Sequence, residues 1–469
     1  MYDIFRTGSA FMYQIDFKKP QHVHFIGIGG ISMSGLAEIL LKENFTISGS
    51  DNKPSALTEH LINLGATVNY PQKASNISDG IDVVVYTAAI HEDNPELMEV
   101  RRQNLPTLTR AELLGQLMKN YETPIAISGT HGKTTTTSML SHILLEAEKD
   151  PTISVGGILK AIGGNIRVGN SDVFVTEACE YTNSFLDFFP RIAVMLNVEE
   201  DHMDFFKDID DIRSSFHKFA ALLPKEGALI INKNIEKMET ITDGLTCNII
   251  TYSEIQDADY SAANISFNEF GNASFDLIKY GKNVGRIQLS VAGQHNVSNA
   301  LSTIAVADLL EIDMDTIQRG LLSFTGTDRR FQYKGERNGF TIIDDYAHHP
   351  TEIEATLTSA QNYPHREIWC IFQPHTYTRT KAFFHEFAQA LSLADHVILA
   401  DIYAARETDT LGMSSEALAG EIKKLGCDAY YLSSFEAIEN FVLKKCFHGD
   451  LLITMGAGDV VNIGDSLLK

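Results

Sequence analysis

A glycine loop between an apolar run and a helical pattern constrains the fold of this chain more than any other feature. Residues 124–128 predict a buried parallel strand, and Gly129 and Gly132 interrupt the chain after it. Lys133 and Thr134 then open a segment with apolar residues at helical spacing. A strand, a glycine loop and a Lys-Thr pair at a helix N-terminus are the arrangement that holds a triphosphate, because backbone N–H groups and the helix dipole face the anion. The alternative interpretation is a generic glycine turn before a helix.

In a triphosphate site of this kind, Lys133 reaches the β and γ oxygens and the hydroxyl of Thr134 takes Mg²⁺. The loop is shorter than the common form of the motif, because position 127 is Ile where that form has its first glycine. The helix is expected to bury one face, made of Met139, Leu140, Ile143, Leu144 and Ala147.

The composition is that of an ordinary globular protein with several domains. Its 469 residues are too many for one core and predict about three domains. The net charge of −23 argues against wrapping a nucleic acid or lying on an anionic membrane, whereas a phosphate site is built locally. The five cysteines show no paired spacing, which predicts reduced thiols in the cytoplasm. We find no signal-peptide pattern and no apolar run long enough to span a membrane.

Strands that alternate with helical stretches predict parallel sheets covered on both faces. The first domain, residues 1–120, follows a polar leader and has expected strands from His22, at 45–48 and at 83–87. The second domain, residues 121–328, has further strands near 173–176 and 192–198, and an antiparallel excursion indicated by alternation at 274–279 and 285–290. The third domain, residues 329–469, is expected to be a doubly wound sheet with strands at 340–344, 367–372, 396–400, 428–432 and 451–454 and helices at 350–361, 380–393, 414–425 and 435–445.

A second glycine turn follows the first strand of the chain. Gly27, Gly29 and Gly30 resemble a dinucleotide fingerprint, although its third glycine would fall at Ser32. Ser50 and Asp51 end the next strand, where an acidic residue commonly meets a ribose. The interpretations are a nucleotide-diphosphate site, with NAD as the sharper version, or a tight turn without a ligand.

Acidic residues follow two strands that are expected to end beside the phosphate loop. Glu177 follows one of these strands, and His202 lies in the acidic segment 199–204 after the other. Carboxylates at this sheet edge reach a Mg²⁺ bound to a triphosphate, and Glu177 is the better candidate ligand because His is unusual on this hard ion. The alternatives are a solvated acidic loop and a structural role for His202.

Asn296 and Asn299 offer donors and acceptors for a base edge, and His295 offers a stacking ring. On spacing alone, N-capping of the following helix explains this polar segment equally well or better. Arg330, in the segment 328–331, is placed to neutralise a γ-phosphate, although two adjacent arginines are more often a surface pair.

Two further strand ends carry groups that suit a small amino acid. Asp344 and the pair His348–His349 follow one strand, and Arg379 follows the next. An arginine pairs with a carboxylate, and a histidine or an aspartate with an amine. Because neighbouring side chains point apart, at most one of the two histidines faces a given site.

Together these blocks resemble the Mur ligase family. The segments that carry the resemblance are 25–30 with 33–35, 129–134, 177–180, 201–204, 293–300, 328–331, 344–352 and 373–380, in the family's order. The resemblance covers almost the whole chain after the leader. It implies an α/β protein of three domains: a Rossmann-like N-terminal domain that holds a UDP-sugar, a central P-loop ATPase-like sheet with a small antiparallel excursion that binds ATP, and a Rossmann-like C-terminal domain that brings in the amino acid. The first glycine turn is then a UDP-diphosphate site rather than an NAD site.

The resemblance also assigns roles to individual residues. The residues implied to contact ATP are Gly129, Thr130, His131, Gly132, Lys133, Thr134, Thr135, His295, Asn296, Asn299, Arg330 and Asp344. Thr134, Glu177 and His202 are implied Mg²⁺ ligands. The implied substrate contacts are Gly27, Gly29, Gly30, Ser50 and Asp51, with His349 and Arg379 facing L-alanine. Lys133, His202, Arg330, His349 and Arg379 are the implied catalytic residues.

The implied reaction joins L-alanine to the lactyl carboxylate of UDP-N-acetylmuramate through an acyl phosphate, giving ADP and phosphate, in peptidoglycan precursor synthesis. It uses ATP and Mg²⁺, with two ions expected and Mn²⁺ as a substitute. The expected partners are the two small substrates, with no nucleic acid and no membrane, and the expected assembly is a monomer or a weak homodimer.

This chain departs from the family pattern at two places. Many relatives carry Glu-Ala-Asp-Glu-Ser where residues 177–181 read Glu-Ala-Cys-Glu-Tyr, and Arg where this chain has Thr376, which leaves Arg379 as the one motif arginine for an amino-acid carboxylate. Later-acting members of the family use a carbamylated lysine after the segment that contains His202. This chain has Phe216 at about that position, so we predict no such modification. The nearest alternative function is a recycling ligase that attaches tripeptides, and more distant ones are an NAD-dependent oxidoreductase and a nucleotide-binding sensor.

Overall fold

The computed structural model describes residues 13–469 except 88, 406 and 410, so most of the predicted polar leader lies outside the described residues. The chain divides into two compact units. One unit holds the residues up to Thr130 together with 149–229 and 237–249, and the other holds 131–148, 230–236 and 250–469. The predicted boundaries after residues 120 and 328 stay predictions.

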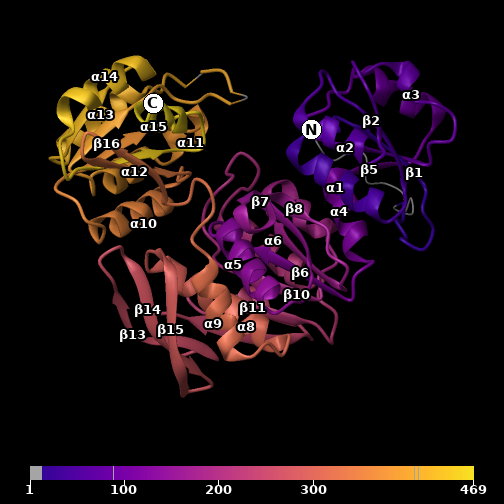
Figure 1. The fold of residues 1–469 in the computed structure, drawn as a ribbon, viewed down its shortest axis with the longest axis horizontal. Coiled ribbons are helices and arrows are strands. Elements are labelled where there is room, and N and C mark those ends of the chain that lie inside the picture. The colour runs from indigo at the N-terminus through magenta and orange to yellow at the C-terminus, as the bar shows by residue number, and fades with distance from the viewer. Residues whose placement is uncertain (1–12, 88, 406, 410) are drawn as a thin grey trace. The chain divides into compact units, whose positions relative to one another are not determined.

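The N-terminal sheet has five parallel strands (Figure 1). In spatial order they are β3 (Thr67–Asn69), β2 (Thr46–Ser50), β1 (His22–Ile26), β4 (Val83–Tyr86) and β5 (Thr107–Thr109). The helices of this region are α1 (Ile31–Lys42), α2 (Ala56–Asn63), α3 (Pro95–Gln103) and α4 (Arg110–Met118). The glycine turn therefore leads from β1 directly into α1, as the sequence predicts.

A ten-stranded sheet contains the phosphate loop. Its order is β15 (Lys282–Ala292), β14 (Asn272–Lys279), β13 (Tyr260–Phe267), β12 (Asn248–Ser253), β11 (Ala228–Asn232), β10 (Ile192–Met195), β6 (Thr123–Ser128), β9 (Val173–Ala178), β7 (Thr152–Leu159) and β8 (Gly164–Arg167). Strand β6 pairs in parallel with β9 and β10, whereas β14 pairs antiparallel with β13 and β15. The predicted parallel sheet with an antiparallel excursion is therefore confirmed.

The helices associated with these strands are α5 (Lys133–Glu146), α6 (Ile209–Ala220), α7 (Glu239–Thr242), α8 (His295–Leu309) and α9 (Met314–Ser323). Helix α5 begins directly after the phosphate loop and buries Met139, Leu140, Ile143 and Leu144, as its spacing predicts. Ala147, predicted on the same buried face, is the half-buried C-cap residue instead, because the helix ends at Glu146. Gly320 of α9 lets that helix approach α5 closely, because a Cβ atom there would lie 2.6 Å from the Cα of Ile143.

The C-terminal sheet has six strands in the order β16 (Gln332–Arg337), β17 (Phe340–Asp345), β21 (Leu451–Met455), β18 (Ile368–Phe372), β19 (His396–Leu399) and β20 (Asp428–Tyr431). Only β16 runs antiparallel to its neighbour among the pairs of this sheet, and the sequence analysis did not predict this edge strand. Helices of this region are α10 (Pro350–Gln361), α11 (Tyr377–Ala382), α12 (Phe384–Leu391), α13 (Ser415–Lys424), α14 (Phe435–Lys445) and α15 (Val461–Leu467). The single helix predicted at 380–393 is wrong, because the chain forms two helices separated at Phe383.

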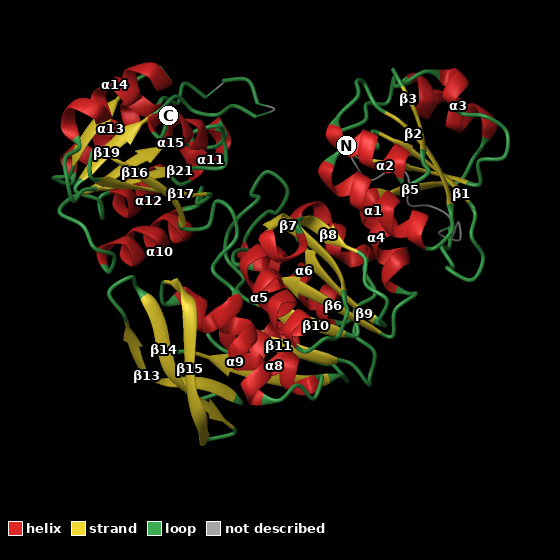
Figure 2. Ribbon diagram, viewed as in Figure 1, coloured by secondary structure: helices red, strands yellow, loops and turns green. Residues whose placement is uncertain are grey.

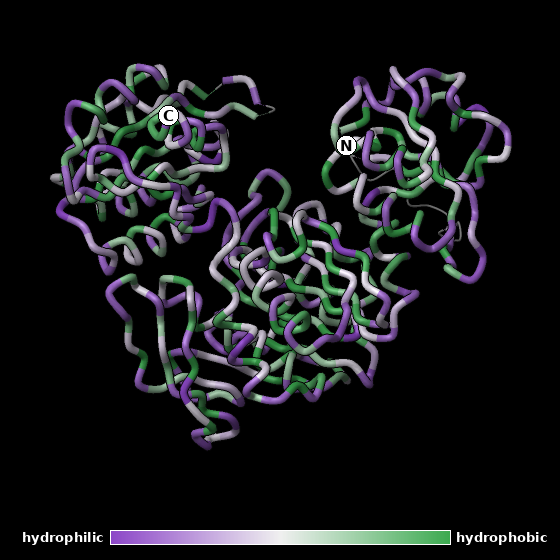
Figure 3. Tube along the Cα trace, in the orientation of Figure 1, coloured by the Kyte–Doolittle hydropathy of each residue, from purple (hydrophilic) through white to green (hydrophobic). Residues whose placement is uncertain are grey.

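Both faces of the C-terminal sheet are covered by helices (Figure 2). Along β18 the side chains alternate, with Cys370 and Phe372 in one core and Trp369 and Ile371 in the other. Helices α10, α12 and α13 contribute to the first core, and α14 and α15 to the second. Hydrophobic segments run through the sheet regions, whereas many outer loops are hydrophilic (Figure 3). The doubly wound arrangement predicted for this region is confirmed.

No helix among the described residues is long and apolar enough to cross a membrane.

Close packing at Gly115 of α4 provides a test of the fold. A Cβ atom at this position would lie 1.9 Å from the backbone carbonyl oxygen of Asp187, so Gly115→Ala forces the backbone to move. We expect it to lower the free energy of unfolding by about 2 kcal/mol, as overpacking does. Gly420→Ala is the matched control, because that helical glycine has open space around it and alanine raises helix propensity by up to about 1 kcal/mol. Thermal unfolding of both variants checks this, and an equal effect of the two substitutions contradicts it.

Candidate active site

The phosphate loop is anchored at its first residues by the segment that follows β10. The backbone N–H of Leu196 donates to the Ser128 carbonyl at 3.0 Å, and the N–H of Thr130 donates to the Asn197 carbonyl at 3.2 Å. The Thr130 hydroxyl oxygen accepts the N–H of Glu199 at 3.0 Å. Gly129 has φ +140°, and a Cβ atom on it would lie 2.9 Å from the Cβ of Leu196. Glycine is therefore required at the point where the loop leaves the sheet.

The second half of the loop turns the chain into α5. Gly132 has φ +85° and occupies the N-cap position, where the structure shows no side-chain cap. The N–H of Thr136 donates to its carbonyl at 2.9 Å, so Lys133, Thr134 and Thr135 form the first helical turn. Backbone N–H groups in a first turn point out of the helix toward the positive end of its dipole. The helix start predicted at Lys133 is confirmed, and phosphate contacts of Lys133 and Thr134 stay predictions.

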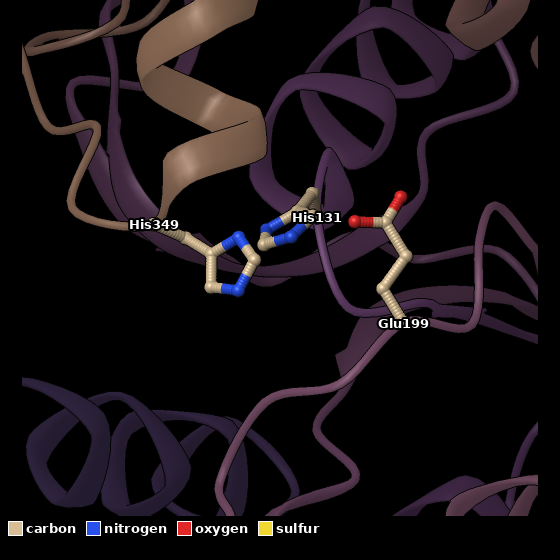
Figure 4. A group of neighbouring side chains, drawn as sticks. All are labelled: His131, Glu199 and His349. Atoms are coloured by element: carbon tan, nitrogen blue, oxygen red, sulfur yellow. The ribbon is translucent and has the colours of Figure 1, made fainter. Parts of the chain in front are cut away.

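His131 of the loop lies beside His349, the N-cap residue of α10 (Figure 4). The two ring centroids are 4.7 Å apart. His349 is 4% exposed, and its Nδ1 accepts the Thr351 N–H at 3.4 Å. Figure 4 also draws Glu199, whose backbone N–H bonds to Thr130. His348 contacts Tyr346, His375 and Glu352, whereas His349 lies against His131 and Phe383. The two adjacent rings have different neighbours, and the expectation that at most one of them faces a given site stays a prediction.

Glu177 projects from β9, the strand next to β6. In the parallel register Glu177 pairs with Ile127, two residues before the loop. Its Oε1 accepts the backbone N–H of Gly156 at 2.5 Å, and a Cβ atom on Gly156 would lie 2.9 Å from Oε2. Gly156 therefore forms a cradle that accepts this carboxylate, and a side chain at position 156 would push the carboxylate out of this position.

His202 belongs to the same unit as Glu177 and sits among acidic groups. Its Nε2 lies 3.6 Å from Glu180 Oε1 and 3.8 Å from Asp201 Oδ2. Its ring lies 4.5 Å from the ring of Tyr181, and its φ of +53° is unusual for a residue with a side chain. An oxygen-rich cluster around an imidazole matches a cation site, and the strained backbone fits a functional residue.

The two asparagines of α8 form a pair. The Asn299 side-chain amide donates to Asn296 Oδ1 at 3.0 Å, and the Asn296 amide donates to the Ala292 carbonyl at 2.6 Å. The helix has no side-chain cap at Gln294, so N-capping does not explain these residues. Both asparagines are largely buried, whereas His295, the residue directly before Asn296, is exposed.

The adjacent arginines separate into different environments. Arg329 Nε donates to Asp344 Oδ2 at 3.0 Å, and its Nη2 donates to the Gly456 carbonyl at 2.6 Å. The Thr454 hydroxyl donates to the other oxygen of Asp344, at 2.6 Å, and burial raises the pKa of this aspartate above its usual value. Both guanidinium groups lie over the Tyr346 ring, but Arg330 lies 3.8 Å from Glu352 Oε1 rather than in a hydrogen bond to Asp344. Arg329 and Asp344 thus hold the C-terminal sheet, and the predicted contact of Asp344 with ATP stays a prediction.

Asp345 fixes the segment that carries Arg330. It accepts the N–H groups of Phe331 and Ala347 at 2.7 and 2.8 Å. Burial raises the pKa of Asp345 to about 6, although the positive charge of Arg330 opposes this.

Arg379 lies in the first turn of α11. The hydroxyl of Thr376 accepts its backbone N–H at 3.4 Å, and Thr376 has φ +66° at the N-cap. Glu407 accepts the N–H groups of Tyr377 and Thr378 at 2.7 and 3.0 Å. Thr376 therefore caps this helix at the position where relatives were expected to carry arginine.

The first glycine turn is built around Ser50 and Asp51. Asp51 Oδ2 accepts the Gly29 N–H at 2.8 Å, and the Ser50 carbonyl accepts the N–H of Gly27 at 2.9 Å. The Ser50 side chain is fully buried and donates to Glu96 at 2.5 Å. Ser50 thus holds the turn in shape, and the predicted substrate contacts of both residues stay predictions.

Three models of the same family match successive parts of the chain. They are the Mur ligase family catalytic domain at residues 22–122, the Mur ligase middle domain at 127–307 and the Mur ligase glutamate ligase domain at 329–458. The chain belongs to the Mur ligase family. It is therefore a ligase with the three-domain α/β fold of that family.

Relatives and solved structures agree with the family models. The chain is 58% identical to the UDP-N-acetylmuramate–L-alanine ligase of Lachnospira eligens over 98% of its own length and 100% of the relative's. It is 59% identical to the ligase of the same name from Agathobacter rectalis over the same shares. The crystal structure of UDP-N-acetylmuramate-alanine ligase from Thermotoga maritima superposes with a TM-score of 0.78 at 29% identity, covering 96% of this chain and 98% of that one. A murein peptide ligase from Psychrobacter arcticus superposes with 0.68 at 27% identity over the same shares.

Three residues near the predicted site were missed by the sequence analysis. Glu96 binds Ser50, Gly156 cradles Glu177, and Glu352 contacts both His131 and His348. Glu352 lay inside a segment that the resemblance singled out, so its position three residues after His349 was an available signal. Glu96 and Gly156 act across long sequence separations, and spacing alone carries no sign of them.

The two arginines give a paired test. Arg329→Ala leaves Asp344 buried without its guanidinium, so we expect unfolding to become easier by about 3 kcal/mol. Arg330→Ala removes a more exposed group, so we expect it to lower the free energy of unfolding by less than about 1 kcal/mol. We also expect this variant to suppress ligation. Denaturant unfolding and ADP formation measure the two effects. Equal destabilisation by both variants contradicts this division of roles.

Proposed function

We propose that this chain is an ATP-dependent ligase that joins L-alanine to the lactyl carboxylate of UDP-N-acetylmuramate and releases ADP and phosphate. The observation that carries the proposal is identity of 50–59% to ligases named for these two substrates, over at least 95% of the chain. The phosphate loop supports it, since its geometry suits the triphosphate that such a reaction consumes.

The nucleotide is held, in this proposal, by groups from two places in one unit. The first turn of α5 offers Lys133 and backbone N–H groups to the phosphates, and Thr134 offers a hydroxyl. The linked pair Asn296 and Asn299 presents amide groups of the kind that read a base edge. His295, exposed beside them, supplies a ring for stacking.

Mg²⁺ fits the donors around Glu177 and His202. The Gly156 cradle presents the Glu177 carboxylate in one fixed position, and carboxylate oxygens are the ligands that this ion prefers. We propose Thr134, Glu177 and His202 as the residues that hold the metal. When bound, Mg²⁺ neutralises charge on the transferring phosphoryl group. The number of ions, and Mn²⁺ as a substitute, stay predictions.

The first chemical step activates the acid. A carboxylate is a poor acylating agent, because its leaving group would be oxide. Its oxygen therefore attacks the γ-phosphorus of ATP, the bond to the β-γ bridging oxygen breaks, and the products are an acyl phosphate and ADP. Both reactants are anions, so Lys133 and Arg330 lower the barrier by neutralising their repulsion.

The second step forms the amide bond. The neutral amine of L-alanine attacks the acyl carbon, and inorganic phosphate leaves from the tetrahedral intermediate. One proton has to leave the nitrogen, and we propose His349 or a neighbouring carboxylate as its acceptor. Arg379 is the proposed partner of the alanine carboxylate. His349 is buried against His131 and Phe383, which shields its ring from bulk water.

The remaining expectations about context stay part of the proposal. They are a place in peptidoglycan precursor synthesis, a cytoplasmic location, and action as a monomer or weak homodimer without nucleic acid.

Substrate dependence tests the proposed function. We expect the purified chain to form ADP only when ATP, UDP-N-acetylmuramate, L-alanine and a divalent cation are all present. Replacing L-alanine with glycine or L-serine measures the selectivity of the enzyme for its amino-acid substrate. A muramyl tripeptide in place of L-alanine is the arm that distinguishes a recycling ligase, and a reduced nicotinamide cofactor tests an oxidoreductase. ADP formation that is faster with the tripeptide overturns the assignment.

Lys133→Ala tests the role of the phosphate loop. Loss of this positive charge should reduce phosphate release by at least about a hundredfold, because the anionic transition state loses a main stabilising group. Binding of UDP-N-acetylmuramate, measured by calorimetry, should change little. The matched control is Lys149→Ala, an exposed lysine just after α5, which should keep full activity. Substantial turnover by the Lys133 variant contradicts the assigned role.

A further inference from the structure

We propose that Glu352 is a positioning residue for phosphoryl transfer, which fixes His131 of the phosphate loop and Arg330 in one arrangement before the nucleotide arrives. This inference rests on the proposed function, because it assigns a role in the use of ATP. Glu352 lies in the first turn of α10 and belongs to the same unit as its partners.

One carboxylate contacts three groups that carry or accept positive charge. Its Oε1 lies 3.2 Å from His131 Nδ1 and 3.8 Å from Arg330 Nη1. Its Oε2 lies 3.2 Å from His348 Nδ1 and accepts the His348 backbone N–H at 3.1 Å. Glu352 is the shared neighbour of residues that come from the loop, from the segment before β16 and from the N-terminus of α10.

The environment keeps this carboxylate ionised. The side chain is 13% exposed, and burial alone would favour its neutral form. His348 and His131 outweigh that effect and hold the pKa of Glu352 well below its usual range.

A fixed arrangement of these groups matters because phosphoryl transfer depends on charges that are in place before the reaction. Donors aimed at developing charge lower the barrier only if they need no reorganisation. The side chains of Arg330 and His131 both have rotatable torsions, and fixing each of them in one arrangement costs entropy. A shared anion removes this freedom from both at once. The cost is a negative charge near a triphosphate, which its three partners offset.

Helix capping is the competing explanation. Glu352 is the third residue of α10, and a glutamate there commonly accepts a backbone N–H at the helix start. Glutamine serves equally well in that capping role but carries no charge. The variant Glu352→Gln therefore separates the two roles.

In the experiment, ADP formation by the full chain is measured at varied ATP with UDP-N-acetylmuramate and L-alanine saturating. We expect Glu352→Gln to lower kcat at least tenfold, while KM for ATP stays the same or falls because an anion has been removed. Thermal unfolding of Glu352→Gln should begin at a lower temperature than in the parent, because the carboxylate loses its charge pairing with His131 and His348, but the variant should be fully folded at the assay temperature. KM for UDP-N-acetylmuramate should stay within twofold. Glu354→Gln, an exposed glutamate on the same helix, is the matched control and should behave as the parent.

A second readout does not depend on turnover. Proton NMR should show changed chemical shifts for the His131 and His348 rings in Glu352→Gln, because both rings lose a charged neighbour at 3.2 Å, and no such change in Glu354→Gln. A kcat within twofold of the parent, or unchanged ring signals, overturns the proposal. A parent protein that forms no ADP counts against the proposed function instead, and the ring signals still decide whether Glu352 positions the two imidazoles.

Discussion

The close approach of the phosphate loop to the strand end beside it is the constraint on which the rest of the site depends. Gly129 leaves β6 with φ +140° against Leu196, where a Cβ atom would collide, and Thr130 is tied to Asn197 and Glu199. The loop therefore has one path into α5. That path places Lys133 and Thr134 in the first helical turn, where the helix dipole adds to their effect on an anion. Glycine at 129 and 132 is thus a steric requirement rather than a source of flexibility.

The parallel register extends this constraint to the acidic residues. Because β6 and β9 run side by side, Glu177 is level with Ile127 and its carboxylate belongs to the same sheet edge as the loop. The register alone leaves the carboxylate free to rotate. The Gly156 N–H on β7 then selects one orientation. The site thus combines a glutamate side chain on β9 with a glycine on the neighbouring strand β7.

Long periodic segments were predictable from the sequence because periodicity reports burial directly. The antiparallel excursion and the doubly wound C-terminal sheet are confirmed, and the start of α5 follows from the glycine positions. Strand β16 was missed because its exposed edge carries Gln, Lys, Glu and Arg, and the break at Phe383 was missed because apolar residues continue through it. In the site, the loop was predictable as a contiguous motif. The division between Arg329 and Arg330 was not, because it depends on Asp344 and Gly456, which are distant in sequence.

Membership of a motif does not say whether a polar residue meets a ligand or holds the scaffold. Burial energetics decides between these roles, because a buried charge or hydroxyl needs partners inside the protein. Asp344 and Ser50 have such partners, in Arg329 with Thr454 and in Glu96, so both side chains help to hold the scaffold, and their predicted ligand contacts stay predictions. Arg330 lies over the Tyr346 ring and 3.8 Å from Glu352 Oε1, and its charge also acts on the buried carboxylate of Asp345. At 3.8 Å the Glu352 carboxylate orients Arg330 by its charge, at a separation longer than a hydrogen bond, whereas Arg329 donates to Asp344 at 3.0 Å. We therefore expect Arg330, rather than Arg329, to have N–H donors that can turn to an anion.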